Sequence, residues 1–118
     1  MRECIFCRII RKDIPSTGVY EDADIFAFYD INPVAPVHLL LIPKLHIISL
    51  AEIEEKHHTL LGKIMVLVPR LAKKEGCADG FRTIINTGYV GGQEVDHLHI
   101  HIIGGGKERL PAMIHRPN

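Results

Sequence analysis

Three histidines alternate with aliphatic residues in the segment DHLHIHIIGG, residues 96–105. Side chains of an extended strand point to opposite faces in turn, so His97, His99 and His101 are predicted to share one face. The aliphatic side chains between them share the other face, which is predicted to be buried. The imidazole face needs its own explanation, because histidine is the commonest metal ligand and changes its charge near neutral pH.

This spacing allows three interpretations. One is a metal site, because Cα atoms two residues apart in a strand are about 6.7 Å apart and both rings can reach one ion. All three rings on one ion is awkward, since His97 and His101 are twice as far apart. The second is a nucleophile and phosphate binder on a rigid strand, and the third is a solvated face that alternates by chance. Glycines at 91–92 and 104–106 favour the second, because they let backbone N–H groups approach an anion closely.

The rest of the chain predicts the elements that position this strand. HLLLIP, residues 38–43, is apolar on both faces and is predicted to be a central strand. Ser49 and Glu52 have the spacing of a capping box and open a helical region. The predicted elements are a short helix over 4–11, two strands within 18–30, a strand over 38–43, a long helix from about 54 to 75, and strands over 81–88 and 97–103. Strands arranged as a meander with helices to one side indicate an α+β fold.

The composition is that of an ordinary globular protein. A chain of 118 residues is predicted to form a single domain over 1–118, and 47% hydrophobic with 24% charged residues excludes a disordered chain. Fourteen basic and fourteen acidic residues cancel, so no net charge favours nucleic acid or an anionic membrane. No apolar run is long enough to span a bilayer, and the three cysteines do not build a disulfide framework. We therefore expect a cytoplasmic protein.

The pattern His-φ-His-φ-His-φ-φ at 97–103 resembles the signature of the histidine triad (HIT) superfamily of nucleotide hydrolases and transferases. The similarity extends to the histidine triad nucleotide-binding branch, whose bacterial members are purine nucleoside phosphoramidases. It rests on FAFYDINPVAP (26–36), HLLLIPKLH (38–46), NTG (86–88) and GGQEVDHLHIHIIGG (91–105). The resemblance implies a HIT-like fold, a five-stranded antiparallel sheet with one long and one or two short helices, paired about a two-fold axis into a ten-stranded sheet.

The resemblance also implies a role for each histidine of the motif and for one more. His99 matches the family nucleophile, which attacks the α-phosphorus of an AMP-amine and forms a nucleotidyl-histidine that water hydrolyses. His101 matches the histidine that contacts the phosphate and the leaving group, which suits it to proton donation. His38 matches the histidine that orients the nucleophile through a hydrogen-bond relay, and His97 matches the structural histidine that faces away.

A purine-nucleotide site follows from the same resemblance. Asp30 is placed to accept hydrogen bonds from the ribose hydroxyls, which requires a carboxylate without a competing salt bridge. The other implied residues are Ile5, Phe6, Ile9, Phe28 and Ile31 around the base, Asn86 and Gly92 at the phosphate, and Gln93, Glu94 and Val95 in the adjoining loop. By residue type alone, the apolar ones could equally be core, Asn86 a turn residue and Gln93 an exposed one. The implied ligands are AMP, GMP and adenosine phosphoramidates.

Cys4 and Cys7 form a C-x-x-C pair and, with His46 and His97, resemble a structural zinc site found in part of the superfamily. Two thiolates and two imidazoles suit tetrahedral Zn²⁺. Many relatives lack the cysteines, so no cofactor is expected to be required for catalysis. The alternative is that the cysteines are small buried hydrophobic residues and His46 lies on the surface. The remaining histidines are expected on solvated surface: His57, His58 and His115.

The chain departs from the family pattern at Glu94, at Asp96 and at Pro69, which interrupts the predicted long helix and should kink it. Glu94 stands where some relatives carry a phosphate-contacting Ser or Thr, and a carboxylate would repel phosphate, so we expect its side chain to point outward. Asp96 replaces the aromatic residue common just before the triad. The tail, residues 107–118, shapes substrate choice in relatives and leaves that choice open here.

The leading interpretation is a hydrolase that cleaves the P–N bond of AMP-amines through a nucleotidyl-histidine. The alternatives are a nucleotide-binding, zinc-bearing adaptor whose slow hydrolysis is incidental, and a dinucleotide polyphosphate hydrolase. An intact set of His38, His99 and His101 favours catalysis. We also expect a homodimer through the long helix and an edge strand, because a two-fold contact would cover the open edge of so small a sheet.

Overall fold

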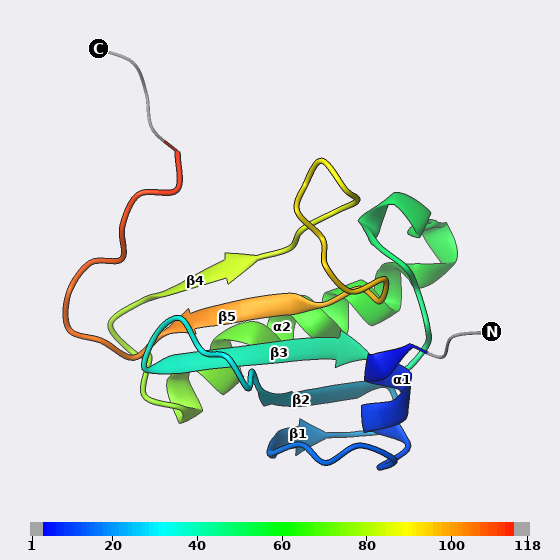
Figure 1. Cartoon of the computed structure of the whole chain (residues 1–118), viewed down its shortest axis with the longest axis horizontal. Helices are drawn as coiled ribbons and strands as arrows, with labels where there is room; N and C mark the ends of the chain where they lie inside the picture. The colour runs from blue at the N-terminus through cyan, green and yellow to red at the C-terminus, as the bar shows by residue number, and fades with distance from the viewer. Residues whose placement is uncertain (1–3, 115–118) are drawn as a thin grey trace.

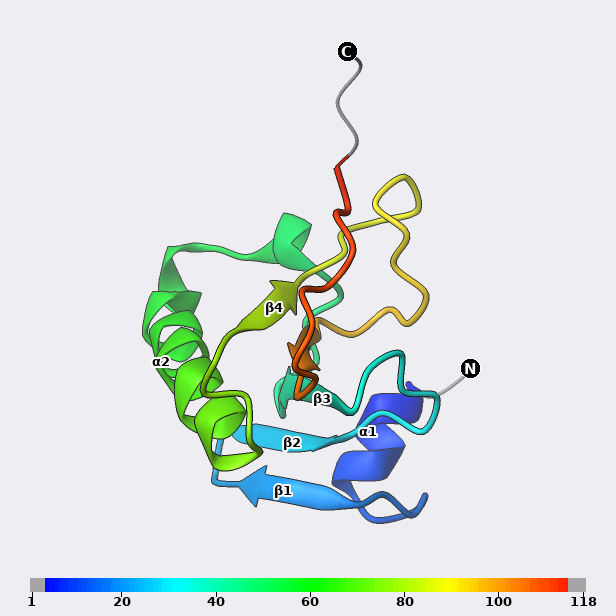
Figure 2. The ribbon, with the colours of Figure 1, turned by 90° about the vertical axis from the view of Figure 1, so that its left-hand side faces the viewer.

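The computed structural model describes residues 4–114, which form a five-stranded antiparallel sheet with a helix on each face (Figures 1 and 2). The long helix α2 spans His58–Lys74 and the short helix α1 spans Ile5–Ile10. The strands are β1 (Gly18–Glu21), β2 (Ile25–Tyr29), β3 (Val37–Pro43), β4 (Phe81–Ile84) and β5 (Ile100–Gly104). The predicted α+β class and five-stranded antiparallel sheet are confirmed. The structure is of a single chain, so the two-fold dimer stays a prediction.

The order of the strands is β1-β2-β3-β5-β4, which corrects the expectation of a meander with helices to one side. Both β3 and β4 are antiparallel to β5, so they run parallel to each other, and a parallel connection needs a crossover such as α2. The crossover carries the chain to the far edge, and β5 returns between the two strands. His101 therefore has a register partner on each side, Leu40 on β3 and Ile84 on β4.

The two faces of the sheet have separate cores. Leu39 and Leu41 of β3 pack, with Ile100 and Ile102 of β5, against the buried stripe of α2. Leu40 of β3 belongs to the other core, which is built with the α1 side chains and completed by Phe6, Ile9, Phe26, Phe28 and Ile42. Because side chains alternate along a strand, His38 lies on the same face as Leu40. The α1 face is thus the one that carries imidazoles.

The long helix starts later than predicted. Two short 3-10 turns precede α2, η1 (Leu50–Glu52) and η2 (Glu55–His57), because Ile53 between them has an extended backbone. The Ser49 hydroxyl accepts a hydrogen bond from the Ala51 N–H at 3.1 Å, so the predicted capping residue closes a 3-10 turn instead of an α-helix. The helix then runs through Pro69 to Lys74. Among residues 4–114, no helix is long and apolar enough to cross a membrane.

The strand of the histidine motif is shorter than predicted at its N-terminal end. It was expected over 97–103, but β5 begins at Ile100, so His97 and His99 precede it. The neighbouring strand β3 ends at Pro43, whose carbonyl lies 2.8 Å from Nε2 of His97, and the Leu98 N–H donates to the carbonyl of Ile47 beyond that strand at 2.7 Å. Strand β4 likewise ends at residue 84 rather than 88, since no paired strand faces its continuation.

Candidate active site

A cleft of about 440 Å³ opens on the α1 face of the sheet. His38, His99 and His101 line it, with most of the residues that the resemblance implied for a nucleotide: Ile5, Phe6, Ile9, Phe28, Asp30, Ile31, Asn86, Gly92, Glu94 and Val95. Segments far apart in the sequence therefore meet around one cavity. Of the implied nucleotide residues, Gln93 alone is not part of this lining.

A chain of hydrogen bonds fixes the proton positions on two of the imidazoles. The Val34 backbone N–H donates to Nδ1 of His38 at 3.2 Å, so the proton of neutral His38 is on Nε2. That nitrogen lies 2.9 Å from Nδ1 of His101 and donates to it. His101 accepts at Nδ1, so its own proton is on Nε2. Both rings line the cleft, and His101 is thereby set up as a hydrogen-bond donor.

Burial keeps these two histidines neutral. It lowers the pKa of His101 to about 4, with smaller contributions from the neighbouring His99 and His38. Burial also lowers the pKa of His38, although the nearby Asp30 carboxylate opposes this shift. Near pH 7 both rings are therefore uncharged and keep the proton arrangement described above.

His99 has the opposite proton arrangement to His101. Its Nδ1 donates to the backbone carbonyl of His97 at 2.7 Å, which leaves a lone pair on Nε2. The ring is 6% exposed, and its centroid lies 5.1 Å from that of His101. Side by side in the cleft, His99 offers a lone pair and His101 offers a proton. This is the arrangement that nucleophilic attack with protonation of a leaving group requires.

Asp30 lies beside the imidazoles, with 18% of its side chain exposed. Its Oδ1 accepts from the Asn32 N–H at 2.8 Å, and its Oδ2 is 3.4 Å from Nε2 of His38. The sequence-based expectation was a carboxylate without a competing salt bridge. Because burial holds His38 neutral, the contact is not an ion pair near pH 7, and lone pairs of the carboxylate remain for a ligand.

Gln93 joins its own loop to the segment at Ile48 through side-chain hydrogen bonds. Its side-chain oxygen accepts from the Gly88 N–H at 2.9 Å, and its amide nitrogen donates to the carbonyls of Ile48 at 2.6 Å and Val95 at 2.9 Å. The alternative of a merely exposed Gln93 is therefore wrong. Glu94 lines the cleft and is an exposed residue, and the expectation that it turns away from a phosphate stays a prediction.

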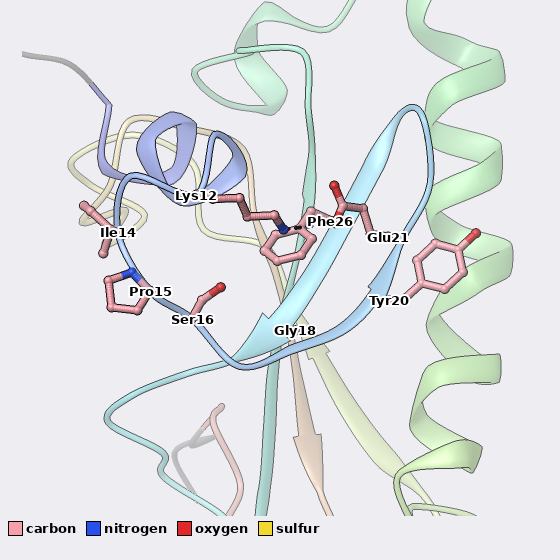
Figure 3. A pocket seen from close by; sticks show the side chains of 8 residues that line it. All are labelled: Lys12, Ile14, Pro15, Ser16, Gly18, Tyr20, Glu21 and Phe26. Carbon is pink, nitrogen blue, oxygen red and sulfur yellow. Dashed lines mark hydrogen bonds and ion pairs between the residues drawn. The ribbon is translucent and has the colours of Figure 1, made fainter.

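Several lining residues were missed by sequence reasoning: Ile14, Pro15, Ser16, Asn32, Val34 and Leu40. Leu40 carried a signal because it is two residues from His38 in a strand, and Asn32 and Val34 lie within the motif at 26–36, whereas residues 14–16 carried none. Residues 14–16 also line a neighbouring cleft of about 380 Å³ at the β1 edge (Figure 3). There Lys12 pairs with Glu21 at 3.0 Å and lies over the ring of Phe26. No histidine is among the lining residues of that cleft, so it lacks the chemistry of the first.

The two cysteines and two histidines predicted as metal ligands come together at the N-terminus of α1; we call Cys4, Cys7, His46 and His97 the Cys–His cluster. Nδ1 of His97 lies 3.3 Å from the Cys4 sulfur, 3.7 Å from the Cys7 sulfur and 3.2 Å from Nδ1 of His46. All four donor atoms lie within 4.8 Å of one another. The set could hold one tetrahedral ion.

A hydrogen bond outside the Cys–His cluster supports this fit. Nε2 of the fully buried His97 donates to the Pro43 carbonyl at 2.8 Å, so the lone pair of the neutral ring is on Nδ1, beside the two sulfurs. Metal-bound histidines are oriented in this way, with the second nitrogen donating to a carbonyl or carboxylate. Both cysteines are partly exposed, which disfavours the alternative of small buried hydrophobic residues. His46 is exposed, as that alternative expected.

Asp30, His38 and His101 are a second group of ligand-type residues with donor atoms within 4.8 Å. They do not suit a metal, because the lone pair on Nδ1 of His38 accepts from Val34 and that on Nδ1 of His101 accepts from His38. The remaining histidines lie elsewhere. His58 is exposed as expected, whereas His57 is partly buried and its ring accepts from the Glu54 N–H at 3.0 Å; His115 is outside the described residues.

Comparison with protein families matches residues 11–108 to the HIT domain. Among solved structures, a HIT family hydrolase from Clostridium thermocellum superposes with a TM-score of 0.89 at 43% identity, over 97% of this chain and 99% of that one. The fold of this chain, with its crossover topology, is therefore similar to that of a solved HIT family hydrolase.

Curated relatives have similar identity, and the matches cover from 74% to 96% of their length. The purine nucleoside phosphoramidase of Escherichia coli K12 is 45% identical over 97% of this chain and 96% of its own. The adenylylsulfatase HINT1 of Arabidopsis thaliana is 48% identical over 91% of this chain and 74% of its own. The 14 kDa zinc-binding protein of Zea mays is 48% identical over 91% of this chain and 85% of its own.

Proposed function

The chain belongs to the HIT domain family, and we propose from that premise that it is a nucleotide hydrolase that cleaves the P–N bond of AMP-amines. The observation that carries the proposal is the opposite proton arrangement of two adjacent imidazoles. His99 has its proton held by the His97 carbonyl, and His101 has its Nδ1 occupied by His38. A lone pair and an N–H are thereby offered side by side. The relative from Escherichia coli named purine nucleoside phosphoramidase supports the choice of substrate.

The reaction we propose has two displacement steps. Nε2 of His99 bonds to the α-phosphorus while the P–N bond breaks, and the amine nitrogen takes that electron pair and a proton that His101 passes on from solvent. The bound substrate anion favours uptake of a solvent proton by His101, and the ring is neutral again once it has given a proton to the amine. Water then attacks the phosphorus of the nucleotidyl-histidine, the P–N bond to His99 returns its electrons to the ring, and the proton lost by the attacking water goes to solvent. The products are AMP and the free amine. Two easier displacements replace one difficult one.

The remaining site residues have supporting roles in this proposal. His38 is a positioning residue, because its hydrogen bond sets the proton of His101. Asp30 is proposed to accept from the ribose hydroxyls. The apolar side chains of the cleft are proposed to hold the purine by shape and stacking, and the phosphate is proposed to lie near Asn86, Gly92 and the backbone of 93–95.

Zn²⁺ is proposed to bind the Cys–His cluster with a structural role. The donor set and the hydrogen bond from His97 to Pro43 support this, as does the name of the relative from Zea mays. When bound, the ion would tie α1 to the segments around residues 46 and 97. No step of the proposed reaction passes through it, because His97 Nδ1 is directed at the sulfurs and not at the cleft residues.

A homodimer is proposed through α2 and the edge strand β4. Apolar side chains are exposed on both elements: Met65 and Val66 on α2, and Phe81 on β4. An unpaired edge strand also exposes backbone N–H and C=O groups that a two-fold partner could satisfy. Sedimentation at micromolar concentration is expected to give twice the chain mass, and a monomer would contradict this part of the proposal.

A substrate panel tests the proposed activity. Purified protein is offered adenosine and guanosine phosphoramidates, a dinucleotide polyphosphate and adenosine 5′-phosphosulfate, and the release of AMP or GMP is measured. The phosphosulfate is included because the relative from Arabidopsis thaliana is named adenylylsulfatase and attack at the same phosphorus would need only another leaving group. We expect the phosphoramidates to have the highest kcat/KM. AMP binding without turnover of any compound would favour the adaptor instead.

A further inference from the structure

Helix α1 contributes to two sites at once. Cys4 and Cys7, at its start, belong to the Cys–His cluster, while Ile5, Phe6 and Ile9 line the cleft. The helix has six residues, which is too short to be stable without tertiary contacts. Its position therefore depends on what its two sets of side chains contact. Whatever fixes the cysteines also fixes one wall of the cleft.

Phe6 connects the two sites directly. Its ring packs edge-on against the ring of His97 in the Cys–His cluster, with centroids 5.8 Å apart, and against the ring of His99 in the cleft, at 5.2 Å. On the base side, the same ring meets Phe28 at 5.7 Å. The side chain is 6% exposed. Packed side chains of this kind transmit small displacements, because no space remains in which to absorb them.

The backbone of His97 provides a second connection. Its ring belongs to the Cys–His cluster, and its carbonyl accepts the hydrogen bond from Nδ1 of His99 at 2.7 Å. The next residue, Leu98, is tied to the carbonyl of Ile47, which adjoins the ligand His46. A change in how His97 is held therefore reaches both the orientation and the proton of His99.

We propose that Phe6 is a positioning residue that couples the Cys–His cluster to the nucleotide cleft, so that metal and nucleotide each raise the protein's affinity for the other. This rests on the proposed function, since a purine nucleotide is the ligand of that function. The coupling is expected to be favourable because of preorganisation. A metal that joins the two cysteines to His46 and His97 orders helix α1, which carries the apolar wall of the cleft. A nucleotide that packs against this wall orders the cysteines in turn.

Two titrations of the wild-type protein test the coupling. The dissociation constant of Zn²⁺ is measured by competition with a chelating dye, without AMP and with saturating AMP. The dissociation constant of AMP is measured with the zinc-loaded and the chelator-stripped protein. We expect each ligand to tighten the other by at least about fivefold, the lower end of typical couplings, and linkage requires the two factors to be equal.

The outcomes separate this inference from the proposed function. If both ligands bind and neither changes the other's affinity, the coupling is wrong and the proposed activity stands. If AMP does not bind to either form of the protein, the proposed function fails and the coupling fails with it. If zinc binds and AMP weakens it, the sign of the coupling is wrong.

A pair of variants assigns the coupling to Phe6. Phe6→Leu removes the flat ring that contacts His97 and His99, and we expect zinc still to bind while the coupling factor falls toward one. Phe26→Leu is the matched control, because Phe26 is 3% exposed in the same core and faces the neighbouring cleft beside Lys12 (Figure 3). The control is expected to keep the wild-type coupling factor. Thermal melts of both variants check that folding is retained, and equal coupling in the two variants would overturn the role of Phe6.

Discussion

The two imidazole clusters of this protein are both in contact with the side chain of Phe6, and they have different chemistry. In the cleft, hydrogen bonds run from Val34 to His38 and from His38 to His101, so protons alternate with lone pairs along the series. In the Cys–His cluster, Nδ1 of His97 faces two sulfurs and the Nδ1 of a second imidazole. The first arrangement suits proton transfer, and the second suits a cation.

The comparison shows that the partner of the other ring nitrogen decides what a histidine does. His97 and His99 are two residues apart and both contact Phe6. The Nε2–H of His97 donates a hydrogen bond to the Pro43 carbonyl, which leaves a lone pair on Nδ1. The Nδ1–H of His99 donates to the His97 carbonyl, which leaves a lone pair on Nε2. Backbone carbonyls thus leave a lone pair on Nδ1 of His97, beside the two sulfurs, and on Nε2 of His99, which lines the cleft.

Of the variants proposed here, replacement of the proposed nucleophile in the cleft should cause the largest loss of turnover. His99→Asn retains a group of similar shape without a nucleophilic ring nitrogen. We expect turnover of adenosine phosphoramidate to fall by roughly 10⁴–10⁶-fold, as when the nucleophile of a catalytic unit is removed, while AMP binding and zinc content stay near wild type. His58→Asn, on the exposed start of α2, is the control. Comparable turnover by the His99 variant would exclude the covalent route.

The second effect in size is the loss of the proposed proton donor. His101→Gln keeps a polar side chain that can occupy the same place but cannot act as a proton carrier. We expect kcat to fall by about 10²–10⁴-fold, the usual contribution of general acid catalysis. Substrates with a more acidic amine, which need less protonation on leaving, should lose less. A loss that is equal for all amines would show that His101 binds the phosphate and does not transfer a proton.

Removing the two thiols of the Cys–His cluster should abolish zinc binding and leave the hydrolytic reaction in the cleft intact. In the Cys4→Ser, Cys7→Ser double variant we expect about one Zn²⁺ per chain to be lost and turnover at saturating substrate to persist. At a zinc concentration 100 times its Kd, the ion stabilises wild type by about 2.7 kcal/mol, and the variant should not gain this stability. Cys77→Ala alters the buried thiol outside the cluster and is expected to keep the metal. Zinc retained by the double variant would refute the ligand assignment.

The pH dependence of stability tests the neutral state of the cleft histidines. An unfolded histidine titrates near pH 6.5, whereas burial first, and then the neighbouring His99 and His38, lower the pKa of folded His101 to about 4. The unfolded state therefore binds more protons between these values, so the free energy of unfolding is highest above about pH 6.5 and falls as the pH drops toward 4. Thermal melts across this range should show a shallower fall for His101→Gln than for wild type. The exposed His58→Gln should behave like wild type, and equal slopes for all three proteins would contradict the shift.

Local patterns predicted much of the site because they depend on neighbours in the sequence. The alternation around His101 indicated a strand with imidazoles on one face, and the apolar run at 38–43 indicated a central strand, which β3 is. The resemblance then implied a nucleotide site whose residues, apart from Gln93, line one cleft. Gln93 was implied as a loop residue near the phosphate, and the structure shows it bracing that loop from outside the cavity.

The sequence by itself determined which residues could do chemistry: the alternating histidines, the C-x-x-C pair and the central strand that carries His38. Only the tertiary structure decided that β5 lies between β3 and β4, that α1 is on the face opposite α2, and that residues 14–16 reach the cleft. It also decided where each ring proton sits, because the Pro43 and His97 carbonyls and the Val34 N–H are fixed by contacts between distant segments. Spacing along a chain sets which face a side chain takes, but hydrogen-bond partners contributed by other elements set what that side chain can do.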